Sequence, residues 1–180
     1  MNNIFKVFCA LIVLTISTSS FGDYWDGMDA WEVKDYEAAF EEFKPLAEQG
    51  DPSSQYMLGF LYDRGLGVLQ DYKQAVKWYS KAAAQGDADA QNDLGLMYEV
   101  GQGVLQDYRK AAVWFRKAAD QGQAYAQMNL GQLYCDGFGV PKDLSLSKYW
   151  MNMAYESGKL KQSSLEMIER WWGWCELAKY

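Results

Sequence analysis

The sequence predicts an all-α protein built as a right-handed superhelical array of helix-turn-helix repeats, that is, an α-solenoid. The first observation is an internal period of 36 residues, which superimposes Gly50, Gly86, Gly122 and Gly158. The second is a loop sequence, GLGVLQD at 65–71, that returns as GQGVLQD at 101–107 and GFGVPKD at 137–143. The third is the spacing of apolar residues by three and four positions, which is typical of helices. A period between about 20 and 50 residues indicates stacked repeats.

Residues 1–22 have the pattern of a secretory signal peptide. Lys6 forms a basic start, Val7 to Ile16 an apolar stretch, and small polar residues lead to an expected cleavage site near Gly22. The apolar stretch is too short to span a membrane. We therefore expect a periplasmic or secreted protein. The alternative is a soluble protein whose N-terminus is apolar by chance.

The rest of the chain divides into repeats with a closing element at each end. In the middle repeat, the periodicity predicts a first helix at about 88–99 and a second at about 108–120. A short helix with Trp25, Met28 and Trp31 and a helix from Tyr36 to Gln49, capped by Asp35, are expected before the repeats. The expected segments are N-terminal capping helices at 23–49, repeats at 50–86, 87–122 and 123–158, and a C-terminal capping helix at 159–180.

Glycine and aspartate recur at fixed positions of each repeat. Gly59, Gly95 and Gly131 fall inside the first helices, where a glycine costs about 1 kcal/mol relative to alanine. We infer that a side chain at this register would collide with a neighbouring helix. The carboxylates that precede the second helices are interpreted as N-caps rather than catalytic or metal-binding groups: Asp71, Asp107 and Asp143.

The repeat resembles that of the Sel1-like repeat family, which is related to the tetratricopeptide repeats. The pattern L-G-x-x-Y-x-x-G-x-G-V-x-x-D-x-x-x-A-x-x-W-[YF]-x-x-A-A-x-x-G is present throughout 58–86 and 94–122 and more loosely in 130–158. The resemblance covers about 50–159. It implies a helical array used as a protein-binding scaffold, and it leaves the partner open.

Composition argues against most other classes of function. The formal net charge is −7, and it becomes −8 when Lys6 leaves with the signal peptide, which disfavours nucleic acids and anionic membranes as partners. The chain has no histidine, which excludes histidine-based triads and most zinc sites. An S-x-x-K sequence at Ser145 to Lys148 lacks its companion motifs and is interpreted as helix surface. We expect no catalysis, no cofactor and no metal site.

Two cysteines remain outside the signal peptide, Cys135 and Cys175. The cysteine-rich branch of the family pairs cysteines between consecutive helices, but this chain has Ala83 and Gln91 at the matching positions. Cys135 ends the last first-type helix, and Cys175 lies about one turn past the residue in register with it. An even number of cysteines in an exported protein favours pairing, so we predict a disulfide between them. The alternative is two buried thiols.

In related arrays, the first helices line the concave side. The predicted partner-binding residues are positions that vary between these helices while the core stays the same: Tyr56, Phe60, Asp63, Asn92, Leu96, Glu99, Met128 and Gln132. Their apolar members would form a strip with acids at its rim, suited to a helix or an extended peptide. The alternative is that these residues pack against adjacent helices. Trp171, Trp172 and Trp174 are interpreted as a hydrophobic cap, with an exposed platform for a partner or glycan as the alternative.

These observations together predict an exported, non-enzymatic interaction scaffold or adaptor that binds an unidentified protein partner. Because both ends carry closing elements, we expect a monomer. Two other functions remain open. One is a cell-wall or glycan-binding module, and the other is a hydrolase of β-lactam or peptidoglycan substrates.

Overall fold

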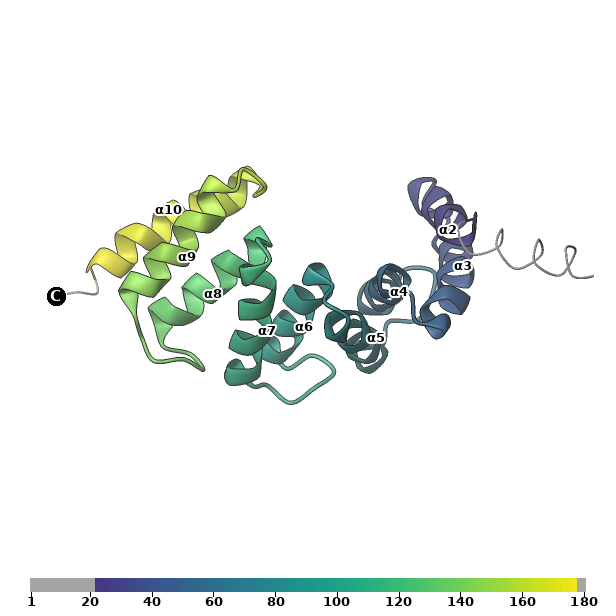
Figure 1. The fold of residues 1–180 in the computed structure, drawn as a ribbon, viewed down its shortest axis with the longest axis horizontal. Coiled ribbons are helices and arrows are strands. Elements are labelled where there is room, and N and C mark those ends of the chain that lie inside the picture. Colours follow the sequence, from purple (N-terminus) through teal and green to yellow (C-terminus); the bar gives the residue numbers. More distant parts are fainter. Residues whose placement is uncertain (1–21, 178–180) are drawn as a thin grey trace, which may run out of the picture.

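The computed structural model describes residues 22–177, and that part of the chain contains nine α-helices and no strand (Figure 1). The all-α prediction is confirmed, and the predicted helices at 88–99 and 108–120 agree with the structure to within one residue. The predicted signal peptide, apart from Gly22, lies outside the described residues. The helices are α2 (Gly22–Glu32), α3 (Tyr36–Gln49), α4 (Pro52–Arg64), α5 (Tyr72–Ala84), α6 (Ala88–Val100), α7 (Tyr108–Asp120), α8 (Ala124–Asp136), α9 (Leu144–Glu156) and α10 (Gln162–Leu177).

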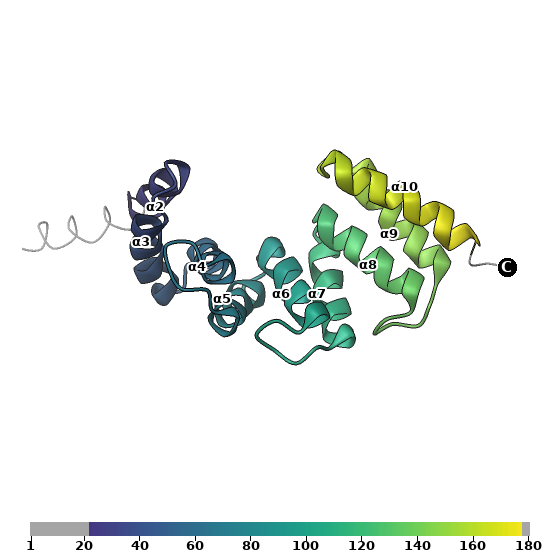
Figure 2. The same ribbon diagram turned by 180° about the vertical axis from the view of Figure 1, so that it is seen from behind.

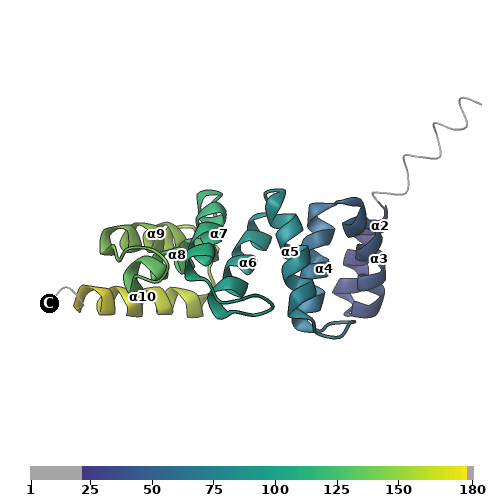
Figure 3. The same cartoon turned by 90° about the horizontal axis from the view of Figure 1, so that it is seen from below.

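The helices form one elongated, curved array in which each helix packs against the next one in the chain (Figures 1 and 2). In Figure 1, α2 and α10 lie at opposite ends and both rise toward the same side, so the array has a concave side between them. The view from below shows the same order along the long axis (Figure 3). Across residues 22–177, no helix combines the length and the apolar character that a membrane crossing would require.

Aspartate side chains cap the helices at their N-termini. Asp71 accepts hydrogen bonds from two backbone N–H groups of α5, at 2.9 and 3.1 Å. Asp107 caps α7 at 3.0 Å, and Asp143 caps α9 with two bonds of 2.9 Å. Asp35 caps α3 at 3.1 Å. The interpretation of these residues as caps is confirmed, because each satisfies a backbone donor that the helix itself leaves unpaired.

The helical glycines lie where the two helices of a repeat touch. A Cβ atom on Gly95 would lie 2.6 Å from the ring of Phe115 in α7, which is closer than two non-bonded carbons approach. At the same register, a Cβ atom would lie 2.7 Å from the ring of Tyr79 for Gly59 and 2.8 Å from the side chain of Met151 for Gly131. The predicted collision is confirmed, and the neighbour is the second helix of the same repeat.

The loop glycines connect one repeat to the one before it. Gly103 has a φ of +70°, and a Cβ atom there would overlap the backbone carbonyl of Tyr72, the first residue of α5. The same contact occurs between Gly67 and Tyr36 and between Gly139 and Tyr108. Left-handed backbone and close approach both favour glycine. The loop therefore sets the spacing between successive repeats.

Buried glutamines also connect the repeats. The Nε2 of Gln91 in α6 donates to the carbonyl oxygen of Ala83 in α5 at 3.0 Å, and its Oε1 accepts from Gln121 at 2.8 Å. Equivalent bonds join Gln55 to Ala47 at 3.0 Å and Gln127 to Ala119 at 3.2 Å. Each bond gives a second donor to a carbonyl near the end of a helix, where the first donor is the backbone N–H of the glycine three residues further on.

Both ends of the array are covered by apolar contacts. At the N-terminal end, Phe43 of α3 is fully buried, and the Tyr24 ring of α2 lies 5.6 Å from it. At the C-terminal end, Ile168 of α10 is fully buried in a cluster with Met151 of α9. Trp171 and Trp172 are half-buried against this cluster, which agrees with their interpretation as a cap. The side chains of Trp174 and Cys175 lie outside the described residues.

Candidate functional site

The first helices of the repeats, α4, α6 and α8, lie side by side and contact one another through polar side chains. Tyr56 of α4 forms a hydrogen bond with the carboxylate of Asp93 in α6. Asn129 of α8 donates from Nδ2 to the Oδ1 of Asn92 in α6 at 3.1 Å. These three helices therefore share one face of the array.

The predicted partner-binding residues on this face differ in exposure. Leu96 is exposed at 36% of its surface, whereas Asn92 and Met128 are buried, at 5% and 8%. The remaining five are half-buried: Tyr56, Phe60, Asp63, Glu99 and Gln132.

Two predicted partner-binding residues, Asn92 and Met128, are buried, and of these Met128 was expected in the apolar strip. Met128 packs in a cluster with Met151 and Ile168, because the closing helix α10 covers this end of the array. Asn92 donates to Asp93 at 3.0 Å and accepts from Asn129. Both side chains are used inside the fold.

The aromatic members of the strip are also engaged by neighbours. The Phe60 ring lies 5.6 Å from the Trp31 ring of α2 in an edge-to-face arrangement. The Arg64 guanidinium lies 5.4 Å from the centre of the same ring. The Tyr56 ring lies 5.8 Å from that of Tyr79. Packing against adjacent helices, the alternative interpretation, therefore accounts for much of this strip.

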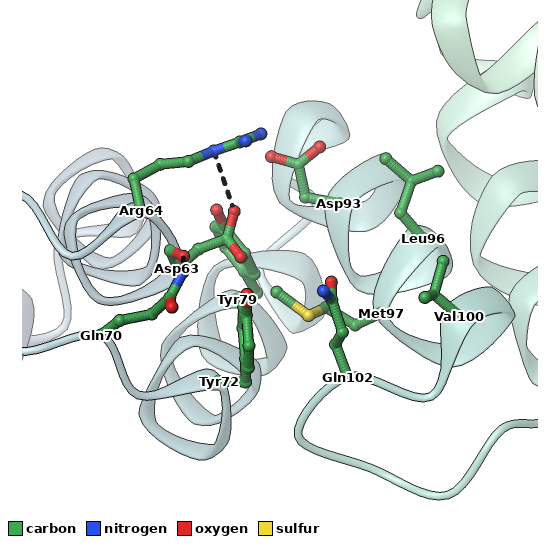
Figure 4. Close-up of a pocket in the computed structure, with 10 residues that line it drawn as sticks. All are labelled: Asp63, Arg64, Gln70, Tyr72, Tyr79, Asp93, Leu96, Met97, Val100 and Gln102. Atoms are coloured by element: carbon green, nitrogen blue, oxygen red, sulfur yellow. Dashed lines mark hydrogen bonds and ion pairs between the residues drawn. The ribbon is translucent and has the colours of Figure 1, made fainter.

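A cavity of about 360 Å³ lies between α4 and α6, beside the loops that follow them (Figure 4). Asp63 and Arg64 border it from α4, and Asp93 and Leu96 border it from α6. Two predicted partner-binding residues, Asp63 and Leu96, are thus brought together here. The other lining residues are Gln70, Tyr72, Tyr79, Met97, Val100 and Gln102.

Asp93 is the most strongly perturbed acid at the cavity. Its pKa is raised to about 6, chiefly by burial and also by the negative charges of Asp63 and Asp89. Hydrogen bonds from Asn92 and Tyr56 act in the opposite direction. Burial outweighs them because it removes the water that would stabilise the ionised carboxylate.

Asp63 and Tyr79 complete the polar side of the cavity. Burial raises the pKa of Asp63. The positive charge of Arg64, whose Nε lies 3.2 Å from the Asp63 carboxylate, acts in the opposite direction. Tyr79 is fully buried, and among the described residues its hydroxyl has no hydrogen-bond partner. Burial, followed by the charges of Asp93 and Asp63, raises the pKa of Tyr79. The hydroxyl therefore lies within the field of both acids.

Asp93 and Tyr79 were not among the predicted site residues, although the repeat contains a signal for them. The register of Asp93 holds Met57 in the repeat before and Asn129 in the repeat after. The register of Tyr79 holds Phe115 and Met151 in the later repeats. At both registers the polar residue replaces an apolar one found in another repeat, and both replacements lie in the same part of the array.

A second acidic pair lies further along the same face. Burial raises the pKa of Glu99 in α6, and the charge of Asp136 in α8 raises it further. Glu99, a predicted partner-binding residue, is half-buried. The acids of the first helices are therefore close enough to repel one another.

The residues considered for catalysis lie on the surface of α9, and the structure also bears on metal binding and on the disulfide. Ser145 and Lys148 are both exposed on α9, and the backbone N–H of Ser145 donates to the cap Asp143 at 2.9 Å. Within residues 22–177, no group of three or more cysteine or acidic side chains is placed to hold a metal ion. Cys135 is buried and takes part in a disulfide bond. Its predicted pairing with Cys175 stays a prediction, because that side chain lies outside the described residues.

Comparison with known structures places these features in a family. A Sel1 repeat protein from Oxalobacter formigenes is 39% identical, with a TM-score of 0.72, and the match covers 76% of this chain and 56% of that one. A protective antigen of uropathogenic Escherichia coli strains with an SLR fold is 38% identical, with a TM-score of 0.76 and coverage of 83% and 33%. Helicobacter pylori cysteine rich protein B shares the fold at 24% identity, with a TM-score of 0.56 and coverage of 74% and 95%.

The chain thus spans about half of the Oxalobacter protein and a third of the Escherichia coli antigen. No curated protein matches the sequence. The Sel1 repeat matches at residues 52–87, 88–123 and 124–159, which together make up more than half of the chain. The chain therefore belongs to the Sel1 repeat family.

Proposed function

We propose that this protein is an exported, non-enzymatic adaptor that binds a segment of a protein partner on the concave side of the array, along the face shared by α4, α6 and α8. Sel1 repeat proteins are generally scaffolds for protein–protein interaction. For this chain we further propose that the partner is a protein segment, that it binds on this face, and that the chain is exported.

The observation that carries the proposal is the cavity between α4 and α6 with Leu96 at its border. An exposed apolar side chain beside a polar cavity offers both hydrophobic contact and specific hydrogen bonds. Leu96 is also the one predicted partner-binding residue that is exposed. We therefore expect Leu96 to be central to the interface.

Site-specific photo-crosslinking in the native cell envelope tests this function. The crosslinking residue would replace Leu96, and a matched probe would replace Val113, an exposed apolar residue on the second helix α7. We expect a discrete crosslinked protein from the Leu96 probe alone. Equal labelling by both probes, or retention on peptidoglycan with no protein crosslink, would contradict the proposal.

Charge substitution gives an independent test once a partner is in hand. Leu96→Glu should weaken binding about tenfold or more, because it places a carboxylate in an apolar contact. Val113→Glu makes the same change outside the proposed face and should leave affinity unchanged. Equal affinities of the two variants would place the interface elsewhere.

Export is supported by the basic, apolar and small-residue pattern of residues 1–22. N-terminal sequencing of the protein recovered from the periplasm or the medium should begin near Asp23. A full-length N-terminus in the cytoplasmic fraction would contradict export without affecting the binding proposal.

A further inference from the structure

The cavity between α4 and α6 is lined by two polar side chains whose registers hold other residues in the next repeat. At the register of Asp93 the later repeat has the neutral Asn129, and at the register of Tyr79 it has Phe115. The array folds with either set, so packing alone does not require the carboxylate or the hydroxyl. These two groups therefore point to a role specific to this cavity.

The Tyr79 hydroxyl is the clearest sign of a missing ligand. It is buried, it borders the cavity, and within residues 22–177 nothing hydrogen-bonds to it. A buried hydroxyl without a partner is costly, and Phe115 shows that an aromatic ring without the hydroxyl fits the same register. A group that enters the cavity would give the hydroxyl a partner.

The charges of the cavity are left unbalanced. Asp93 makes no ion pair within the described part of the chain, since its hydrogen bonds come from the neutral Asn92 and Tyr56. Arg64 is the cation among the lining residues. It pairs with Asp63, but its side chain is 62% exposed, whereas that of Asp63 is 14% exposed. Arg64 therefore lies at the rim and leaves Asp93 uncompensated.

We propose that this cavity binds a lysine or arginine side chain of the partner polypeptide, with Asp93 and Asp63 as charge partners and the Tyr79 oxygen as a further acceptor. The inference rests on the proposed function, because it takes the occupant to be part of a protein bound on the same face. An incoming cation competes with Arg64 for Asp63, and Arg64 can turn to solvent because it is largely exposed.

The shape and lining of the cavity fit this occupant. Lysine and arginine carry only donors at their tips, which match the acceptors of the cavity. Their aliphatic stems can lie along the apolar border formed by Leu96, Met97 and Val100. A volume of about 360 Å³ lies at the small end of ligand cavities, as expected for a single side chain. The formal net charge of −8 that remains without residues 1–22 also favours a basic partner.

A display library of random peptides, selected on the chain without residues 1–22, tests the inference without knowledge of the natural partner. We expect the selected peptides to share a lysine or arginine at a fixed position. Replacing that residue by norleucine or citrulline should weaken binding about tenfold or more. The variant Asp93→Asn should have the same effect, and Tyr79→Phe should have a smaller effect in the same direction.

Both variants carry residues that the next repeat holds at these registers, Asn129 and Phe115, so each is expected to fold. Circular dichroism and urea unfolding would verify this before binding is measured. Asp120→Asn removes one negative charge from an exposed position at the end of α7 and should leave binding unchanged. It separates a local ion pair from a general effect of net charge.

The outcomes distinguish this inference from the proposed function. Peptides that bind without a basic residue, or that tolerate Asp93→Asn but not Leu96→Glu, would overturn the inference and leave the proposed function in place. Peptides that tolerate all of these variants, or the recovery of no binding peptide, would overturn both. If N-acetyl-arginine amide alone bound with the same affinity as the selected peptides, the occupant of the cavity would be a small cation rather than a side chain of a polypeptide. That result would also overturn the inference.

Discussion

The side-chain amide of Gln91 donates to the carbonyl oxygen of Ala83 at 3.0 Å, across the boundary between the first and second repeats. The family resemblance implies that these two positions correspond to paired cysteines in the cysteine-rich branch. A buried hydrogen bond thus joins the repeats where that branch is expected to have a covalent bridge. Gln121 extends the contact by donating to the Gln91 oxygen at 2.8 Å.

Substitution of Gln91 should therefore destabilise the array. Gln91→Ala removes the side-chain bond to the Ala83 carbonyl, which keeps the bond from the Gly86 backbone N–H at 3.1 Å, and it removes the shorter bond of the Gln121 amide. The free energy of unfolding should therefore fall by about 1 kcal/mol, the net value of a typical hydrogen bond. Urea unfolding would measure this loss. Gln49→Ala, at an exposed position of α3, is the matched control and should change stability by less than about 0.5 kcal/mol. Equal effects of the two substitutions would argue against a structural role for the buried bond.

Substitution of glycine by alanine should have opposite effects on stability at two helical positions. Gly95→Ala drives a Cβ atom to 2.6 Å from the Phe115 ring, so it should destabilise the protein by about 1–3 kcal/mol. Gly173→Ala in α10 meets nothing within 4 Å and should stabilise by up to about 1 kcal/mol through helix propensity. Thermal unfolding of both variants would check this. A stabilised Gly95→Ala variant would show that α6 and α7 can separate at little cost.

The raised pKa of Asp93 should make the stability of the folded protein depend on pH. Its pKa is about 6 in the folded protein, above the value of about 3.9 expected for an unfolded chain. A raised pKa means that its contribution to stability is fully present below about pH 4 and is lost as the pH rises through 6. Asp93→Asn should therefore flatten the stability curve between about pH 4 and 6, and at pH 7 it should raise the free energy of unfolding by about 2 kcal/mol.

Urea unfolding at a series of pH values would measure this dependence. Asp120→Asn should keep the slope of the wild-type protein, because Asp120 lies exposed at the end of α7. Identical slopes in wild type and Asp93→Asn would show that burial does not raise the pKa of Asp93 in solution.

The disulfide of Cys135 can be assigned chemically. We expect a non-reducing digest of the chain without its signal peptide to contain a peptide that links Cys135 to Cys175. Closing a loop of this length should stabilise the fold by about 4 kcal/mol, which reduction would remove. Two free thiols in denatured, unreduced protein would contradict the pairing.

Much of the fold follows from local sequence. The period of 36 residues, the cap residues and the glycines predict where helices begin and end, because these signals act within one turn of the chain. The collision at Gly95 was predictable for a similar reason, since a helical glycine at a repeated register implies a close neighbour. Phe115 as that neighbour came only from the packing of α6 on α7.

The residues of the candidate site could be identified only from contacts between repeats. Met128 was expected on the binding face, but the closing helix α10 belongs to the cluster that buries it, and an end effect of this kind leaves no mark on the repeat itself. Asp63 and Asp93 occupy different registers of different helices, so their meeting at one cavity follows from the superhelical stacking of α4 on α6. The sequence by itself determined the repeat, its helices and their caps, because those depend on neighbours along the chain. Only the tertiary structure decided which acids share a cavity and which side chains are buried, because burial is set by residues distant in sequence.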